Sequence, residues 1–242
     1  PGTNSVFDRC SFTSLGDGTY NYGIRSTNSM TVTACQFFNW SKYAIYANQG
    51  GAGQVIKNCT VILASGQAGS GVYLNGDGSG GPVLANTLIY NAGTMGYGVR
   101  VAATADVCTI KNNLVYNDGG TFTVTLEYFR LDSSVTSGNW STDHSSETEA
   151  DATVDSSEDI FVNYGTDFSP NPDGSASGNG LASLAASADF AGNSFASPPA
   201  IGAYATASSG WSAGANINGV ATANIANVNG VAKANMANVN SV

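Results

Sequence analysis

A repeat of about 25 residues runs through the first half of the chain and limits what it can fold into. Each repeat has two short apolar segments separated by Gly, Asn, Asp and Ser. The first segments read RCSF, ACQF, NCTV, ANTL and NNLV, and they place Cys10, Cys35, Cys59, Asn86 and Asn112 at spacings of 25, 24, 27 and 26 residues. The second segments read YGIRS, YAIYA, GVYLN, GVRVA and FTVTLEY. Because so short a unit cannot bury an apolar face alone, the pattern predicts an all-β parallel solenoid of about five or more stacked coils.

Alternation along these segments predicts which side chains point inward, since neighbouring residues of a strand face opposite sides. In the first segments we expect two inward columns, Cys10, Cys35, Cys59, Asn86, Asn112 and Phe12, Phe37, Val61, Leu88, Leu114, and an outward column, Ser11, Gln36, Thr60, Thr87, Asn113. In the second segments we expect Ile24, Ile45, Val72, Val99 and Val124 inward, with Arg25, Tyr46, Tyr73, Arg100 and Thr125 outward. Like residues then stack about 4.8 Å apart, and stacked Asn side chains can bond one another.

With these columns, residues 6 to about 132 resemble the right-handed parallel β-helix of the pectate-lyase-like superfamily. The resemblance implies a single-stranded β-helix, and its right-handedness agrees with the general preference for right-handed crossovers. Residues 167–204, which end in IGAY, resemble the closing segment of many bacterial and phage β-helix proteins. That segment often continues with an acidic residue, whereas this chain has Ala205.

The sequence divides into three parts. Residues 1–132 are expected to form the coils, and residues 133–206 an acidic loop, the last strands and an irregular cap over the final hydrophobic layer. Within this second part, the segment DIFVNYG at 159–165 is expected to return to the core as a strand. Residues 207–242 form a repetitive tail. The chain opens with neither Met nor a signal peptide, which is the pattern of a processed product or a fragment.

Composition excludes several classes of partner. Charged residues make up only 10% of the 242 residues, and the net charge is −9 without any basic cluster, so nucleic acid and anionic membranes are not expected ligands. The sequence lacks an apolar run of about 18 residues, so we expect no membrane insertion. Three of the four cysteines fall in one inward column, where parallel thiols do not converge as a disulfide requires. We expect buried free thiols, and Cys108, outside that column, is expected to be buried as well.

The outward column Arg25, Tyr46, Tyr73 and Arg100 is the candidate ligand-binding surface. Two guanidinium groups beside two phenol rings suit a neutral or acidic sugar, whose apolar face can stack on an aromatic ring while its oxygens accept hydrogen bonds from Arg. The alternative is a sheet face that is simply solvated, or covered by loops or by another subunit.

Enzymatic activity is the alternative reading of the same scaffold. Lyases of this fold use acidic calcium ligands with an Arg or Lys, and related phage hydrolases use paired carboxylates. Here Asp8, Asp17, Asp77, Asp118, Glu127 and Asp132 are scattered, with no pair at matching positions of adjacent coils, although Glu127 could lie near Arg100 and Arg130. His144 stands in an acidic stretch typical of a solvated loop. We therefore predict no catalytic residue, metal ligand or cofactor.

The tail repeats every 11 residues and is almost uncharged. Asn216, Asn227 and Asn238 mark the period, and the apolar positions are Ile217, Val220, Ile225, Val228, Val231, Met236, Val239 and Val242. An 11-residue repeat is compatible with a supercoiled helix, but Asn-Gly between Val residues is also a tight-turn signal. We expect contacts with another chain or with the β-helix to order this tail, which resembles the ends of structural proteins of marine and other bacteriophages.

Together these features favour a non-enzymatic structural or adhesive protein on a virion or other extracellular particle, such as a tail fibre, a spike or a capsid decoration, and able to bind host glycans. Its expected partners are copies of itself or other particle proteins, and a cell-surface glycan. A polysaccharide lyase or glycoside hydrolase, and a secreted bacterial adhesin or filament subunit, are the alternatives. Two carboxylates about 5 to 9.5 Å apart in a groove would favour a glycosidase.

Overall fold

The computed structural model describes residues 4–14, 22–48, 53–63, 69–75, 82–91, 95–101, 109–117, 129–131, 148–151, 160–172, 174 and 176–206, together with four two-residue segments of the tail. Most of these residues belong to strands, and they include one short 3-10 helix, Ala182–Leu184. Among the described residues there is thus no helix with the length and apolar character needed to cross a bilayer.

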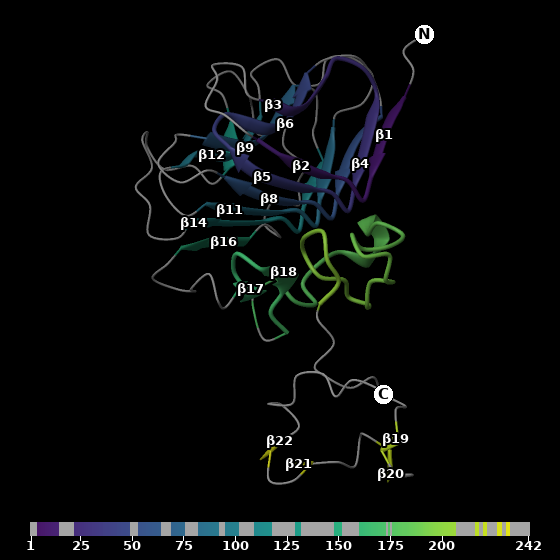
Figure 1. Ribbon diagram of the computed structural model, residues 1–242. Coiled ribbons are helices and arrows are strands. Elements are labelled where there is room, and N and C mark those ends of the chain that lie inside the picture. The colour runs from purple at the N-terminus through teal and green to yellow at the C-terminus, as the bar shows by residue number, and fades with distance from the viewer. Residues whose placement is uncertain are drawn as a thin grey trace.

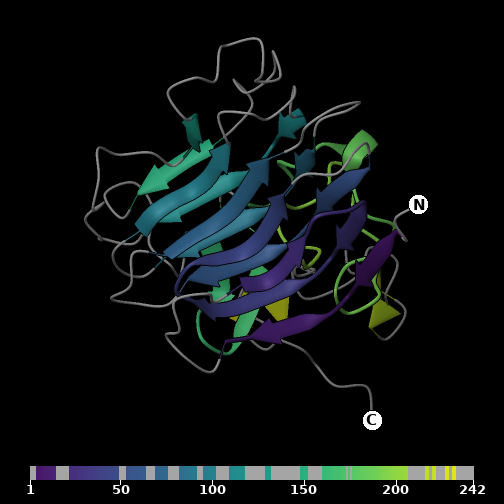
Figure 2. The ribbon, with the colours of Figure 1, turned by 90° about the horizontal axis from the view of Figure 1, so that it is seen from above.

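Three parallel sheets form the walls of a β-helix (Figure 1). Five successive coils supply one described strand to each wall, and the second wall has one further strand. The first sheet contains β1 (Ser5–Asp8), β4 (Met30–Thr33), β7 (Gln54–Lys57), β10 (Val83–Ala85) and β13 (Thr109–Lys111). The second contains β2 (Ser11–Thr13), β5 (Gln36–Trp40), β8 (Thr60–Leu63), β11 (Leu88–Asn91), β14 (Leu114–Asn117) and β16 (Thr148–Asp151). The third contains β3 (Tyr22–Ser26), β6 (Tyr43–Asn48), β9 (Gly69–Asn75), β12 (Met95–Val101) and β15 (Phe129–Leu131). Seen from above, strands of successive coils lie side by side in chain order (Figure 2). The predicted solenoid is confirmed.

The apolar core runs through all five coils, but its register differs from the prediction after the third coil. Phe12, Phe37 and Val61 are continued by Ile89 and Val115 instead of Leu88 and Leu114. The rings of Phe12 and Phe37 stack in parallel with their centroids 4.9 Å apart. The predicted placement of Leu88 and Leu114 inside this core is therefore wrong.

The register error follows from the second sheet being buried on both faces. Leu88 and Leu114 are fully buried, but against residues 160–206 on the outside of the β-helix, where they join Ile62, Tyr90, Ile160, Phe161, Ala176 and Ile201. Gln36 and Thr60 share this outer face and are also buried, with 4% and 1% of their surface exposed. A strand buried on both faces loses the alternation that reveals its register.

A column of turn residues explains the regular spacing of the first segments from one repeat to the next. Arg9, Ala34, Asn58, Asn86 and Asn112 all adopt a left-handed conformation, with φ between 48° and 53°. The cysteine column therefore continues into Thr87 and Asn113, which are fully buried, and the prediction that Asn86 and Asn112 would join it is wrong. Asn adopts the left-handed region more readily than most residues, which accounts for its recurrence in this turn.

Residues 160–206 form a cap that lies along the side of the β-helix, below the second sheet in Figure 1. It begins with a hairpin of β17 (Phe161–Asn163) and β18 (Asp167–Pro170). The predicted strand within 159–165 is thus present, and Ile160 and Phe161 pack in the outer hydrophobic cluster, but the strand pairs with β18 and does not join the ladder of the coils. The last described ladder strand is instead β16, which pairs with β14. The cap crosses three coils, because Asn58, Asn86 and Asn112 each donate a side-chain hydrogen bond to one of its carbonyls. The end-on position that we predicted is thus replaced by a lateral one.

These amides also replace the predicted bonds between stacked Asn side chains. Asn86 donates from Nδ2 to the carbonyl of Leu181 at 3.0 Å and accepts from the Leu181 N–H at 2.7 Å. Asn58 binds the carbonyl of Ala200 and the N–H of Ala186 in the same way. A bond of the predicted kind occurs in the third sheet, where Asn75 donates to Asn48 at 2.7 Å.

Three of the cysteines are described, and they are free thiols, as predicted. Cys35 and Cys59 are buried, whereas Cys10 is only partly buried and Cys108 lies outside the described residues. Burial raises the pKa of the Cys35 thiol to about 12 and also raises that of Cys59. Both thiols donate to backbone carbonyls two residues earlier, at Thr33 and Lys57.

The described part of the tail forms two small antiparallel hairpins. One joins β19 (Asn216–Ile217) to β20 (Val220–Ala221), and the other joins β21 (Asn227–Val228) to β22 (Val231–Ala232). The tight-turn alternative is therefore correct for these segments. The apolar positions Ile225, Met236, Val239 and Val242 lie outside the described residues.

Candidate functional site

The predicted column Arg25, Tyr46, Tyr73 and Arg100 lies in one continuous row across the third sheet. Arg25 pairs in register with Tyr46, Tyr46 with Tyr73, and Tyr73 with Arg100. The inward neighbours Ile24, Ile45, Val72 and Val99 are buried as predicted. Arg130 follows Arg100 in the register and Phe129 follows Val99, in the places predicted for Thr125 and Val124, which lie outside the described residues.

The four side chains form a stack in which cations cover the two ends. The rings of Tyr46 and Tyr73 lie parallel, with an interplanar angle of 5° and their centroids 4.5 Å apart. The guanidinium carbon of Arg25 is 5.6 Å from the Tyr46 ring centroid, and that of Arg100 is 5.5 Å from the Tyr73 centroid. Cation–π attraction of this kind stabilises each Arg over a ring by about 0.5–1 kcal/mol at an exposed site.

A second pair of tyrosines, which the alternation did not identify, supports this stack. The Tyr43 ring lies 5.5 Å from that of Tyr46 and 5.3 Å from that of Tyr73, and Tyr22 lies 5.0 Å from Tyr46. Arg100 Nη1 donates to the Tyr43 hydroxyl at 3.2 Å. Lys42 adds a third cation, with Nζ 5.5 Å from the centroid of the Tyr22 ring.

Small inward residues place these extra tyrosines on the outer face. Ala44 and Ile45 are adjacent in sequence, yet both are fully buried in the core, so the strand does not alternate here. Gly23, one coil earlier, approaches the core so closely that a β-carbon would lie 2.5 Å from the Ala44 carbonyl oxygen. Two consecutive inward positions break the period of two. Tyr22 and Tyr43 therefore lie on the outer face, although they stand two residues before the inward Ile24 and Ile45. Their identical position in two successive repeats was the available signal.

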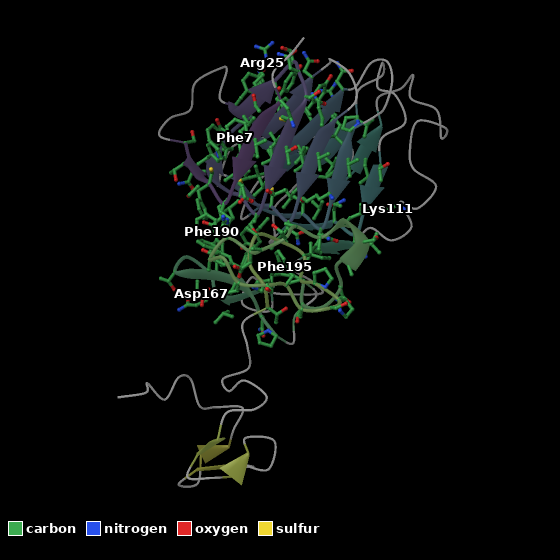
Figure 3. All side chains as sticks on the ribbon, turned by 90° about the vertical axis from the view of Figure 1, so that its right-hand side faces the viewer. Phe7, Arg25, Lys111, Asp167, Phe190 and Phe195 are labelled. Carbon is green, nitrogen blue, oxygen red and sulfur yellow. The ribbon has the colours of Figure 1, made fainter. Side chains whose placement is uncertain are left out.

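The strands of the third sheet carry a positive charge, although the chain as a whole carries −9. The strands of the third sheet contain Arg25, Arg100 and Arg130 and neither Asp nor Glu. Coils about 4.8 Å apart put the α-carbons of Arg25 and Arg100 about 14 Å apart, with Arg130 one step farther. Arg25 is exposed and lies at the end of the molecule opposite the cap residues Phe190 and Phe195 (Figure 3).

This arrangement changes how a ligand can be held. Each face of the Tyr46 and Tyr73 rings is covered, by the other ring on one side and by a guanidinium on the other. A sugar ring therefore cannot stack on either ring without displacing a cation. What the row offers is N–H and O–H donors with positive charge, which suits carboxylate or sulfate groups better than an apolar sugar face.

Among the acidic candidates only Asp8 falls within the described residues. A hydrogen bond from the Thr33 hydroxyl lowers its pKa, and Arg9, whose Nε lies 2.9 Å from Oδ2, lowers it further. This is a local ion pair at the turn after β1. Asp17, Asp77, Asp118, Glu127, Asp132 and His144 lie outside the described residues, and the described residues hold no group of three or more potential metal ligands.

A cavity of about 420 Å³ lies in the cap, lined in part by Asp189, Asn193 and Tyr204. Asp189 is buried, and its carboxylate accepts hydrogen bonds from the N–H groups of Asn193 and Ala205. It thereby ties the IGAY segment to the preceding turn, where Phe190 packs edge to face on Tyr204. These bonds satisfy the buried carboxylate, and we assign it a structural role.

A family model described as a right handed beta helix region matches residues 1–149. No curated protein and no solved structure matches the chain with statistical significance.

Proposed function

Since this chain belongs to the right-handed β-helix family, we propose that its coils serve as a rigid scaffold. The protein is then a non-enzymatic structural or adhesive protein of a virion or other extracellular particle. Its third sheet binds an acidic glycan on a host surface. The observation that carries this proposal is the row Arg25–Tyr46–Tyr73–Arg100, in which cations cover both ends of an aromatic stack.

Preorganisation supports a binding role for the row. Arg side chains normally lose rotamer freedom when they grip a ligand, and that loss weakens binding. Here the ring beneath each guanidinium already holds it, and Arg100 is further fixed by the Tyr43 hydroxyl. A linear polyanion along the β-helix axis can contact both cations, because they lie on the same outer face of one sheet.

Hydrolysis of a glycan on this face would require different residues. A glycosidase needs two carboxyl groups on either side of the scissile bond. The strands beneath the row carry cations and phenols and no Asp or Glu. That composition favours retention of a glycan over its cleavage.

The test is a titration of the full chain with a carboxylated, a sulfated and a neutral oligosaccharide of equal length. We expect binding of at least one acidic oligosaccharide, weakened by added salt, and little binding of the neutral one. Arg25→Gln should weaken binding by about tenfold, the usual scale of one charge-assisted contact. Arg9→Gln is the matched control, because it removes an exposed Arg that pairs with Asp8 and lies outside the third sheet.

Tyr46→Ala together with Tyr73→Ala tests the role of the stack. Without the rings, Arg25 and Arg100 lose their support, and we expect weaker binding of the acidic oligosaccharide with an unchanged far-ultraviolet circular dichroism spectrum. A double variant that binds as well as the parent, on a glycan array or in solution, removes the proposal. So does a parent that prefers the neutral oligosaccharide.

A further inference from the structure

The tail contains one hairpin module repeated at 11-residue intervals. In the first hairpin Asn216 pairs with Ala221 and Ile217 with Val220. In the second, Asn227 pairs with Ala232 and Val228 with Val231, so each paired position recurs 11 residues later. The residues between the strands are Asn-Gly in both, the sequence that favours a two-residue hairpin loop. We call β19–β20 and β21–β22 the tail hairpins.

Each tail hairpin is too small to be stable alone. Its strands have two residues each, and even a longer isolated hairpin is marginal in water. Among the described residues, each hairpin forms a separate two-stranded sheet, which leaves one backbone edge of every strand open. Open edges of this kind are templates for pairing with a further strand.

We propose that the partner of these edges is the tail of a second copy of this chain. Residues 215–242 contain Lys233 as their single charged residue, whereas the whole chain carries −9, so tails do not repel one another as the bodies do. Identical modules also match each other in strand length and in the positions of Asn, Val and Ala, so like residues can lie side by side. The tail hairpins of two chains thus pair edge to edge and link their β-helices, and the smallest product is a dimer. This inference is independent of glycan binding.

The first test measures the mass of the full chain in solution as a function of concentration, together with hydrogen exchange of the tail amides. We expect a mass above one chain, and protection of the amides of residues 220–221 and 231–232 that is lost on dilution. A full chain that stays monomeric, with those amides exchanging as in an unpaired segment, overturns the proposal.

Variants identify the strands as the contact. Ala221→Pro with Ala232→Pro removes two backbone donors that point to the open edge, because the pairs Asn216–Ala221 and Asn227–Ala232 do not bond each other within the hairpin, and the change should weaken association at least about tenfold. Asn224→Pro, placed between the hairpins, is the matched control and should associate like the parent. Deletion of residues 212–242 should also abolish association while the β-helix remains folded. If the double Pro variant associates as strongly as the parent, the tail hairpins are not the contact.

Discussion

Asn86 stabilises the fold through both its backbone and its side chain. Its φ of 50° lies in the left-handed region, and its amide group makes two hydrogen bonds to Leu181 of the cap. Asn58 combines a left-handed turn with cap bonds in the same way, whereas Ala34 occupies the equivalent turn without an amide. The conformation is therefore required by the turn, and the amide is required by the cap.

Two substitutions at position 86 separate these contributions. Asn86→Gly keeps the turn and loses both amide bonds, and we expect the free energy of unfolding to fall by about 1–3 kcal/mol. Asn86→Ala loses the same amide bonds but keeps a β-carbon in the left-handed region, which Gly does not have, so it should lose about 1–2 kcal/mol more than Asn86→Gly. Denaturant unfolding of the two variants measures the difference. Equal stabilities would mean that the turn is not strained, and an unchanged Asn86→Gly would mean that the cap bonds do not stabilise the fold.

At the scale of elements, β11 separates two cores. Leu88 and Ile89 are adjacent and both fully buried, but Ile89 packs inside the β-helix and Leu88 packs against the cap. The strand therefore connects the stability of the coils to the docking of residues 160–206. A further bond at this interface runs from the Ala203 N–H to the Thr60 hydroxyl at 2.9 Å.

Truncation on either face of β11 should have different consequences. Leu88→Ala and Ile89→Ala each remove a buried aliphatic side chain, at a typical loss of about 2–5 kcal/mol. For Leu88→Ala we expect faster hydrogen exchange at the cap amides of Leu181 and Ala203, with the ladder amide of Leu114 still protected. For Ile89→Ala the ladder amide should exchange faster too. Identical exchange patterns in the two variants would contradict the separation into two cores.

At the scale of the whole molecule, only 10% of the residues are charged, and the sequence has a single histidine that can titrate near neutral pH. The buried thiols titrate at alkaline pH. Cys35 remains protonated in the folded state up to a pKa of about 12, whereas an unfolded thiol loses its proton near about 8.5. Between these values the unfolded state binds fewer protons, so stability falls as the pH rises.

We expect this loss to be reduced when the thiol is removed. The free energy of unfolding of the parent should decrease from about pH 9 to about pH 12, and the contribution of Cys35 should be fully present below about pH 8.5. Cys35→Ala should show a shallower decrease over the same range. Parallel pH profiles for the two proteins, measured by denaturant unfolding, would show that the Cys35 thiol is not linked to stability.

The sequence alone determined the stack of coils, because a period of about 25 residues with inward Phe, Ile and Val is compatible with few folds. It also identified the row from Arg25 to Arg100, since each of its residues directly follows an inward Ile or Val on its strand. Only the tertiary structure decided the register of Leu88 and Leu114, whose burial depends on cap residues about 45 to 115 positions later in the chain. It likewise decided that Tyr22 and Tyr43 pack beside the row and that guanidinium groups lie over the outer faces of the stacked Tyr rings. Alternation is a local property of a strand, whereas what covers its outer face is set by distant segments of the chain.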